Sequence, residues 1–272
     1  MSNGDAPRAG IEWNAAVYHQ VADPQYAWGL RVLDRLSLRG DETALDAGCG
    51  SGRLTTALLE RLPRGHVIAV DRSENMLQVA RDYLTPRFGA RVSFVPADLL
   101  NLALPAAVDL IFSTATFHWI PDHDTLFRCL YRTLRPGGRL VAQCGGGPNL
   151  AQTLGRAATL LAAEPFAPYV AGWQGPWLFA DATTTAQRLR AAGFVAVETS
   201  LEEAPTVLPD AAAYRAFVST VIFRLHLERL PDEHLRRAFL DGLVAQGAAT
   251  DPPFMLDYWR LNLQATRPAR TG

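Results

Sequence analysis

The sequence contains no lysine: all 26 basic residues in this chain of 272 are arginine. A lysine general base and a lysine Schiff base are therefore excluded from its chemistry. The formal net charge is −1, and no block of basic residues interrupts the chain. This charge distribution does not indicate a nucleic-acid partner or binding to an acidic membrane surface.

Cysteine is also scarce, and the three present, Cys49, Cys129 and Cys144, are widely separated. No C-x-x-C pair occurs, so neither a zinc site nor a redox dithiol is indicated, and we expect no metal. The odd number argues against a disulfide framework and favours a reduced, cytoplasmic setting. Residues 1–10 lack the apolar core of a signal peptide and are expected to be disordered. No apolar run reaches transmembrane length.

The most informative segment is the loop 46–52, Asp-Ala-Gly-Cys-Gly-Ser-Gly, between an apolar run and an amphipathic stretch that begins near Arg53. Glycines at every second position let the backbone turn tightly and approach a ligand closely. The spacing differs from the dinucleotide pattern G-x-G-x-x-G, and the carboxylate of Asp46 opposes a pyrophosphate. A ligand with an ammonium and a sulfonium group, such as S-adenosylmethionine, suits this loop better.

Strands and helices alternate through the first half of the chain, which at this length suits one α/β domain with a helical addition. Strands are expected at 43–46, 66–71, 91–96, 108–113 and 138–144, and helices within 11–38 and at 53–62, 73–83, 122–134 and 150–163. This alternation predicts a parallel sheet with helices on both faces, which binds ligands at the carboxyl ends of its strands. Asp46, Asp71, Asp98 and Ser113 each fall at one of these ends.

Four segments together resemble the class I S-adenosylmethionine-dependent methyltransferases. They are the glycine motif at 45–52, the strand 67–71, the segment 95–99 and the turn 134–138. Segments 112–115 and 117–119 are most similar to small-molecule enzymes of the trans-aconitate methyltransferase type. The resemblance is close over residues 11–147. It implies a Rossmann-like, seven-stranded, mostly parallel sheet and S-adenosylmethionine as the cofactor.

The resemblance also implies roles for individual residues. Asp71 would accept hydrogen bonds from the ribose hydroxyls, and Asp98, with the N–H of Leu99, would hold the adenine. Tyr18 would lie near the sulfonium, and Gln25 would meet the methionine carboxylate. The remaining cofactor-binding candidates are Asp46, Gly48, Cys49, Gly50, Arg72, Met76 and Ser113. Alternatives stay open: Asp71 and Asp98 as helix caps, Met76 as a core residue, and Tyr18 and Gln25 in surface packing.

His118 follows the fourth strand, where the methyl group of such a cofactor would point, and it is the candidate catalytic residue. A histidine there would remove a proton from an acceptor hydroxyl or amine, or it would orient an acceptor carboxylate. A third interpretation is a histidine that packs beside Trp119. His118 and His123 as metal ligands lack a third partner.

The second half departs from the family pattern, in which the last two strands form a hairpin with a short link. Residues 210–247 instead indicate two amphipathic helices broken at Pro231-Asp232, with a closing strand at 254–265. We interpret 148–180 and 208–250 as a helical cap over the substrate site. Segments 181–207 and 251–267 then supply the remaining sheet elements of the core.

These observations predict an enzyme that methylates a small molecule. O-methylation, for example of a carboxylate, is slightly favoured over N- or C-methylation. We expect a monomer or homodimer without nucleic-acid or membrane partners. Three alternatives stay open: an S-adenosylmethionine-binding enzyme that catalyses a rearrangement, a methyltransferase of RNA, DNA or protein, and a non-catalytic binding protein. The second predicts a basic face or an added binding domain, and the sequence shows neither.

Overall fold

A seven-stranded sheet forms the centre of the molecule. The computed structural model describes residues 23–104, 107–170, 173 and 175–270. The strands of this sheet are β1 Thr43–Ala47, β2 His66–Asp71, β3 Val92–Pro96, β4 Val108–Thr114, β5 Leu134–Gly145, β6 Val195–Glu203 and β9 Trp259–Thr266. Their order is β3-β2-β1-β4-β5-β9-β6, and β9 is antiparallel to both neighbours while the other pairings are parallel. The predicted Rossmann-like fold class is confirmed.

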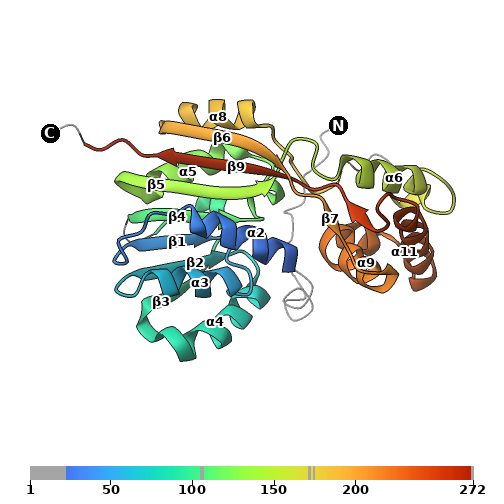
Figure 1. Cartoon of the computed structure of the whole chain (residues 1–272), viewed down its shortest axis with the longest axis horizontal. Helices are drawn as coiled ribbons and strands as arrows, with labels where there is room; N and C mark the ends of the chain where they lie inside the picture. The colour runs from blue at the N-terminus through green and yellow to red at the C-terminus, as the bar shows by residue number, and fades with distance from the viewer. Residues whose placement is uncertain (1–22, 105–106, 171–172, 174, 271–272) are drawn as a thin grey trace, which may run out of the picture.

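Helices cover both faces of the sheet. They are α2 Asp23–Asp34, α3 Arg53–Arg61, α4 Glu74–Phe88, α5 His123–Thr133 and α8 Ala182–Ala191. The first three share one hydrophobic cluster with the sheet, and α5 and α8 share another; Figure 1 shows α2 in front of the sheet and α5 behind it. Successive strand side chains point to opposite faces, so Ala44 joins one cluster and its neighbour Leu45 joins the other.

A helical lobe lies beyond the carboxyl ends of the parallel strands (Figure 1). It comprises α6 Ala151–Leu161, α7 Ala167–Val170, α9 Ala211–Phe217, a π-helical turn at Val218–Ile222, α10 Arg224–Arg229, α11 Glu233–Ala248 and the paired strands β7 Thr206–Val207 and β8 Met255–Leu256. The lobe has its own hydrophobic cluster. Trp28 of α2 and Tyr258 belong to that cluster, with ring centroids 5.0 Å apart, and join the lobe to the sheet.

The second half of the chain differs in detail from the sequence-based expectation. Residues 210–247 form three helical segments, because the π-turn is followed by a break before α10. A second break precedes α11, whose N-terminus is capped by Asp232, which accepts a hydrogen bond from the Leu235 N–H at 2.9 Å. The expected strand 254–265 is divided, since β8 pairs within the lobe and β9 pairs within the main sheet.

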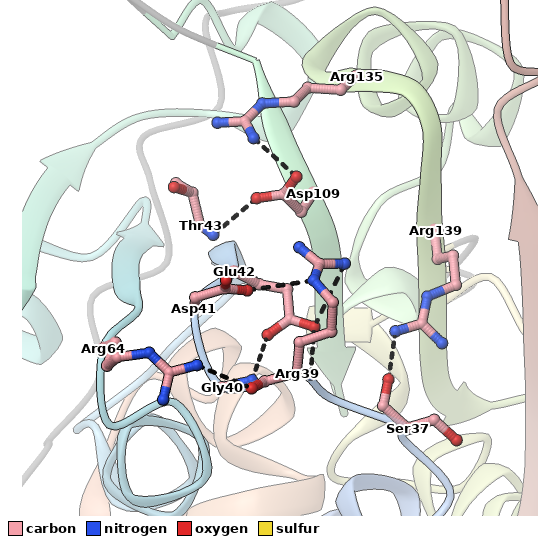
Figure 2. Close-up of polar contacts among 10 residues, drawn as sticks. All are labelled: Ser37, Arg39, Gly40, Asp41, Glu42, Thr43, Arg64, Asp109, Arg135 and Arg139. Carbon is pink, nitrogen blue, oxygen red and sulfur yellow. Dashed lines mark hydrogen bonds and ion pairs between the residues drawn. The ribbon is translucent and has the colours of Figure 1, made fainter.

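A polar network closes the amino ends of β1, β4 and β5, at the edge opposite the lobe (Figure 2). The carboxylate of Asp109 accepts a hydrogen bond from the Thr43 N–H at 2.8 Å and pairs with Arg135 at 2.7 Å. Arg139 donates to the Ser37 carbonyl at 2.7 Å. These contacts tie the loop before β1, and β1 itself, to β4 and β5.

Glu42 is the buried member of this network, with 2% of its surface exposed. Its carboxylate accepts hydrogen bonds from the N–H groups of Arg39 at 2.7 Å and Gly40 at 2.9 Å (Figure 2). Burial raises the pKa of Glu42, but the backbone N–H groups and the Arg39 charge outweigh it. The pKa therefore lies below its ordinary value.

Replacing Glu42 by alanine is expected to lower the free energy of unfolding at pH 7 by about 2–4 kcal/mol, because two backbone N–H groups lose their acceptor. Because the pKa of Glu42 is lower in the folded state, its carboxylate stabilises the folded protein at pH values above the unfolded-state pKa. This contribution is lost as the pH falls through the folded-state pKa. The difference from wild type should therefore shrink toward about pH 3. Urea unfolding of wild type and Glu42→Ala at pH 7 and at about pH 3 measures this difference. The control Asp41→Asn changes an exposed neighbour, and it should shift stability by less than about 0.5 kcal/mol.

Candidate active site

A cleft of about 830 Å³, mouth included, lies at the carboxyl ends of β1, β2 and β4. It is open where the strand order reverses, between β1 and β4, which is where open α/β sheets bind their ligands. The residues lining this first cavity are Gly48, Gly50, Asp71, Arg72, Ser73, Met76, Ala97, Asp98, Leu99, Thr114, Ala115, Thr116, Trp119 and Ile120. Seven of the predicted site residues are among them.

The glycine loop is anchored to β2 at the base of this cavity. The N–H groups of Gly48 and Cys49 both donate to the Val70 carbonyl, at 2.8 and 3.0 Å. Gly48 has a φ of +84°, and a Cβ atom there would lie 2.2 Å from the Thr116 hydroxyl oxygen. Gly50 has a φ of +54° and nothing within 4 Å of an added Cβ. Gly48 thus permits the close packing of two loops, and Gly50 leaves open space beside the cavity.

Asp71 holds the loop from the end of β2. One carboxylate oxygen accepts from the Gly50 N–H at 2.9 Å, and the other accepts from the Ser73 N–H at 2.9 Å. Burial raises the pKa of Asp71, although N–H donors and the Arg72 charge oppose the shift. Each oxygen keeps a second lone pair for a ligand hydroxyl.

The far end of the first cavity is bounded by Asp98, Leu99 and Met76. Asp98 accepts a hydrogen bond from the Leu100 N–H at 2.9 Å and caps a short 3-10 turn, Leu99–Asn101. Arg72 lies 3.8 Å from the other Asp98 oxygen. Met76 is 3% exposed and contributes to the lining as well as to the hydrophobic interior, so the two interpretations of this methionine are compatible.

A neighbouring cavity of about 490 Å³ contains Asp46, Cys49 and Gln25, and shares Gly48, Gly50, Thr114 and Ala115 with the first. Asp46 is 3% exposed and accepts a hydrogen bond from the Thr55 hydroxyl at 2.7 Å. Burial raises its pKa to about 7, with a further increase from Asp71 and an opposing effect of Thr55. A cationic ligand would favour the charged form of this carboxylate.

A further cavity of about 440 Å³, mouth included, lies toward the helical lobe. Its lining is mainly aromatic and aliphatic, with His118, Asn149, Gln25 and Arg260 as the polar members. Ala115 lines all three cavities and has a φ of +54°, which is uncommon for a residue with a Cβ atom. We call the three cavities that Ala115 lines the first cavity (with Asp71 and Asp98), the second cavity (with His118) and the third cavity (with Asp46) below.

His118 is buried in the second cavity between the rings of Trp119 and Phe179. The Gly145 N–H donates to its Nδ1 at 3.2 Å. Burial lowers the pKa of His118 well below its ordinary value, and the Arg260 charge lowers it further. A neutral imidazole that accepts at Nδ1 carries its proton on Nε2. The ring is therefore a hydrogen-bond donor.

Arg260 is the site residue that sequence reasoning missed. It is 3% exposed, lies in β9 opposite Gly145, and stacks over the Trp28 ring at 4.6 Å. The sequence carried no signal for it, because Arg260 shares the polar face of an alternating strand with Asn262 and Gln264, and this pattern indicates a solvent-facing residue. Its partner His118 lies far away in sequence, and only the pairing of β5 with β9 brings the two together.

The other predicted residues separate into three groups. Gln25 lines the second and third cavities, and its Oε1 is buried without a hydrogen-bond partner among the described residues. Ser113 corrects the sequence-based assignment: its hydroxyl donates to the Ala47 carbonyl at 2.6 Å, and Thr114 and Ala115 line the cavity instead. Strand alternation turns Ser113 away from the cavity. Tyr18 lies outside the described residues.

Comparison with known proteins establishes the family. A sequence family described as "Methyltransferase domain" matches residues 44–138. A trans-aconitate 2-methyltransferase of Azoarcus sp. (strain BH72) is 34% identical over 249 residues, which cover 89% of this chain and 91% of that protein. A protein of the same name from Methylobacterium radiotolerans is 33% identical, with coverage of 89% and 91%. The chain belongs to the S-adenosylmethionine-dependent methyltransferases.

Solved structures share the fold of this methyltransferase at lower identity. Phosphoethanolamine N-methyltransferase 2 of Haemonchus contortus, in complex with S-adenosyl-L-methionine, has a TM-score of 0.61 and 21% identity, and the match covers 93% of this chain but 56% of that one. The [4+2]-cyclase SpnF has a TM-score of 0.60 and 20% identity, with coverage of 90% and 82%. These two show the fold alone. The family makes this chain an enzyme that methylates a small molecule, and the alternatives are not favoured.

The residues present fit S-adenosylmethionine, the cofactor of the family. Asp71 and Asp98 supply acceptors in the first cavity, and Asp46 supplies a carboxylate in the third. Gln25 lines the same cavity, and its Oε1 has no hydrogen-bond partner among the described residues. Among the described residues, no cluster of three or more His, Cys, Asp and Glu side chains could hold a metal. Nor does any helix of residues 23–104, 107–170 or 175–270 have the length and apolarity to cross a membrane.

Proposed function

We propose that this methyltransferase esterifies a carboxylate of a small organic acid. The observation that carries the proposal is the buried guanidinium of Arg260 in the second cavity, beside a histidine that serves as a hydrogen-bond donor. Guanidinium and imidazole N–H groups suit a carboxylate, which accepts several charge-assisted hydrogen bonds. The relatives from Azoarcus and Methylobacterium are named for trans-aconitate, which is itself a carboxylate, and this supports the same acceptor group.

The first cavity is proposed to hold the adenosine part of the cofactor. Asp71 would accept from the ribose hydroxyls with the lone pairs that its backbone donors leave free. Asp98 and the N–H of Leu99 would hold the adenine, with Met76 packed against it. Arg72 would lie at the rim, where it pairs with Asp98.

The third cavity is proposed to hold the methionine part. Asp46 would face the ammonium group, with Gly48, Cys49 and Gly50 as the adjoining loop. Gln25 and Arg53 line the same cavity and would meet the methionine carboxylate. The prediction for Tyr18 remains, outside the described residues.

When bound, the cofactor supplies a methyl group on a positively charged sulfur. An acceptor carboxylate oxygen would take up this methyl group, and the sulfur would keep the electron pair of the broken bond, which would give a neutral ester and S-adenosylhomocysteine. No proton has to be removed. Arg260 would balance the acceptor charge, and the Nε2–H of His118 would orient the reacting carboxylate. His118 then acts by positioning, and the possibility of a general base is not needed.

The helical lobe is proposed to act as the cap, with 148–180 and 208–250 enclosing the acceptor. Leu150, Val221, Ile222 and Trp177 bring lobe side chains to the second cavity, and π-turns such as Val218–Ile222 are frequent at functional sites. The free cysteines support a reduced, cytoplasmic compartment. The proposal includes a monomer or homodimer without nucleic-acid or membrane partners.

The proposed reaction is tested by incubating the full chain with S-adenosylmethionine and matched sets of carboxylic acids, alcohols and amines, with trans-aconitate among the acids. We expect S-adenosylhomocysteine and a methyl ester only with acids, identified by mass spectrometry and by hydrolysis of the product in alkali. Turnover with an amine or alcohol, and none with any acid, would contradict the proposal.

Replacing His118 by glutamine is expected to raise the acceptor KM about tenfold and to lower kcat less than about threefold, because a hydrogen bond to a charged group is lost. The wild-type rate should show no acid limb from His118 between pH 6 and 8, since the pKa of this buried ring lies well below 6.5. Steady-state kinetics against pH give both results. The control His123→Gln alters a histidine bonded to the Phe117 carbonyl and should leave KM unchanged. A hundredfold fall in kcat with unchanged KM would make His118 a base.

A further inference from the structure

A fourth cavity, which we call the lobe cavity, lies inside the helical lobe and is not used by the proposed reaction. It measures about 1130 Å³, mouth included, and lies between α6, α7 and α10. Its walls are largely apolar: Leu154, Ala157 and Leu161 of α6, Val170 of α7, and Phe223. A concave site lined mostly by apolar side chains with a few polar groups is a common form of ligand site.

Trp177 lies between this lobe cavity and the second cavity and lines both. The Trp177 ring stacks on Phe179 with centroids 5.8 Å apart and an interplanar angle of 12°, and on His226 at 5.7 Å. Phe179 in turn contacts His118 at 5.8 Å. One row of rings therefore extends from the proposed reacting carboxylate to the interior of the lobe.

His226 places one polar atom in this apolar wall. The residue is 7% exposed, and its Nδ1 is buried without a hydrogen-bond partner among the described residues. Burial, with the charge of Arg229, lowers the pKa of His226 to about 4, so the ring is neutral at pH 7. The ring lines the cavity, and a neutral imidazole can accept a hydrogen bond at one nitrogen and donate one from the other, so it would suit a hydroxyl or carbonyl group of a ligand.

The second cavity and the lobe cavity differ in the charged side chains that line them. In the second cavity, Arg260 is the one arginine among the lining residues that the structure describes. The described lining of the lobe cavity contains no arginine and no carboxylate. One carboxylate of an acceptor would therefore have a cationic partner in the second cavity, whereas the rest of the acceptor would meet apolar side chains in the lobe cavity.

We infer that the acceptor is an amphipathic monocarboxylic acid, whose carboxylate lies at Arg260 and whose apolar tail passes Trp177 into the lobe cavity. An oxygen function along the tail would bind His226. This inference rests on the proposed carboxylate methylation and specifies the acceptor class. A compact tricarboxylate would leave the lobe cavity unfilled.

The test is a series of straight-chain acids, butanoate, hexanoate, octanoate and decanoate, assayed beside trans-aconitate with the full chain. We expect the acceptor KM to fall by up to about fourfold for each methylene that enters the lobe cavity. Ala158 is an exposed alanine on α6 that lines this cavity. Ala158→Phe should raise the KM for decanoate at least tenfold while leaving the KM for butanoate and the affinity for S-adenosylmethionine unchanged. Thr159→Phe, at the next exposed position of α6, is the matched control.

The outcomes separate the two levels of the proposal. If acids are methylated with a KM that ignores chain length and Ala158→Phe, or if trans-aconitate is preferred by more than tenfold over every monocarboxylate, the tail inference is overturned and carboxylate methylation stands. If only amines or alcohols are methylated, both fail. For His226, at least one hydroxydecanoate isomer should be preferred to decanoate by about fivefold in wild type, and His226→Leu should abolish that preference; equal KM values for all isomers would remove His226 from the inference.

Discussion

Replacing Arg260 by methionine is expected to raise the acceptor KM by about a hundredfold or more. Truncating one partner of a buried, hydrogen-bonded charge pair costs about 2–5 kcal/mol, which corresponds to factors from about thirty to several thousand. Methionine keeps an unbranched apolar chain against the Trp28 ring, over which the guanidinium now lies at 4.6 Å. The affinity for S-adenosylmethionine should change less than about threefold, since Arg260 lines the second cavity and neither of the other two.

Two further variants show whether charge or shape is responsible. Arg260→Lys keeps the charge without the planar fork and should fall between wild type and Arg260→Met. Arg35→Met removes an exposed arginine that bonds to Asn262 and Glu202, and it should leave the acceptor KM unchanged. Thermal unfolding confirms that each variant is folded. A folded Arg260→Met enzyme with wild-type KM would remove Arg260 from the acceptor site.

The affinity for S-adenosylmethionine is expected to fall about fivefold between pH 7 and pH 6. Without ligand, burial raises the pKa of Asp46 to about 7, so this carboxyl is largely neutral at pH 6. The proposed ammonium partner requires the charged form, and binding at low pH must first release a proton. The affinity therefore rises with pH up to about pH 7, and it falls again near pH 8, where the α-amino group of the ligand loses its proton. Calorimetric titration in buffers of different ionisation enthalpy measures both the affinity and the proton released.

Variants of Asp46 and its partner locate this effect. Asp46→Asn cannot ionise, so it should bind at least about tenfold more weakly at pH 8 and lose the pH dependence. The Thr55 hydroxyl donates a hydrogen bond to Asp46 at 2.7 Å, and this bond lowers the pKa of Asp46. Thr55→Val removes the hydroxyl and should raise that pKa. The midpoint of the pH dependence should therefore move to higher pH. A slope that persists in Asp46→Asn would assign the proton to another group, of which Asp71 is the nearest candidate with a raised pKa.

The fold and the cofactor end of the site could be predicted because they depend on local patterns. Glycine spacing, strand periodicity and an acid at the end of each early strand are properties of a few consecutive residues. Parallel strands place their carboxyl ends at one edge, so Asp46, Asp71 and Asp98 were expected to converge, and the structure brings Asp71 and Asp98 into one cavity and Asp46 into the adjoining one.

Reasoning from local sequence failed where a shift of one residue changes the direction of a side chain, and where a distant segment determines how a strand pairs. Ser113 and Thr114 are both at the end of β4, yet only Thr114 lines the cavity, because the side-chain direction alternates with every residue. The lobe was expected as a helical cap, but the division of the last strand between two sheets depends on pairing with distant strands, β8 with β7 and β9 with β5 and β6.

By itself, then, the sequence determined the sheet, the glycine loop and the class of cofactor, since these need only local periodicity and turn chemistry. The acceptor end was decided by tertiary structure. The register of β5 against β9 sets Gly145 beside Arg260, and the N–H of Gly145 then selects the donor tautomer of His118. Burial sets the pKa of Asp46 and His118. Each of these depends on what surrounds a side chain in space, and no short segment of the chain contains that information.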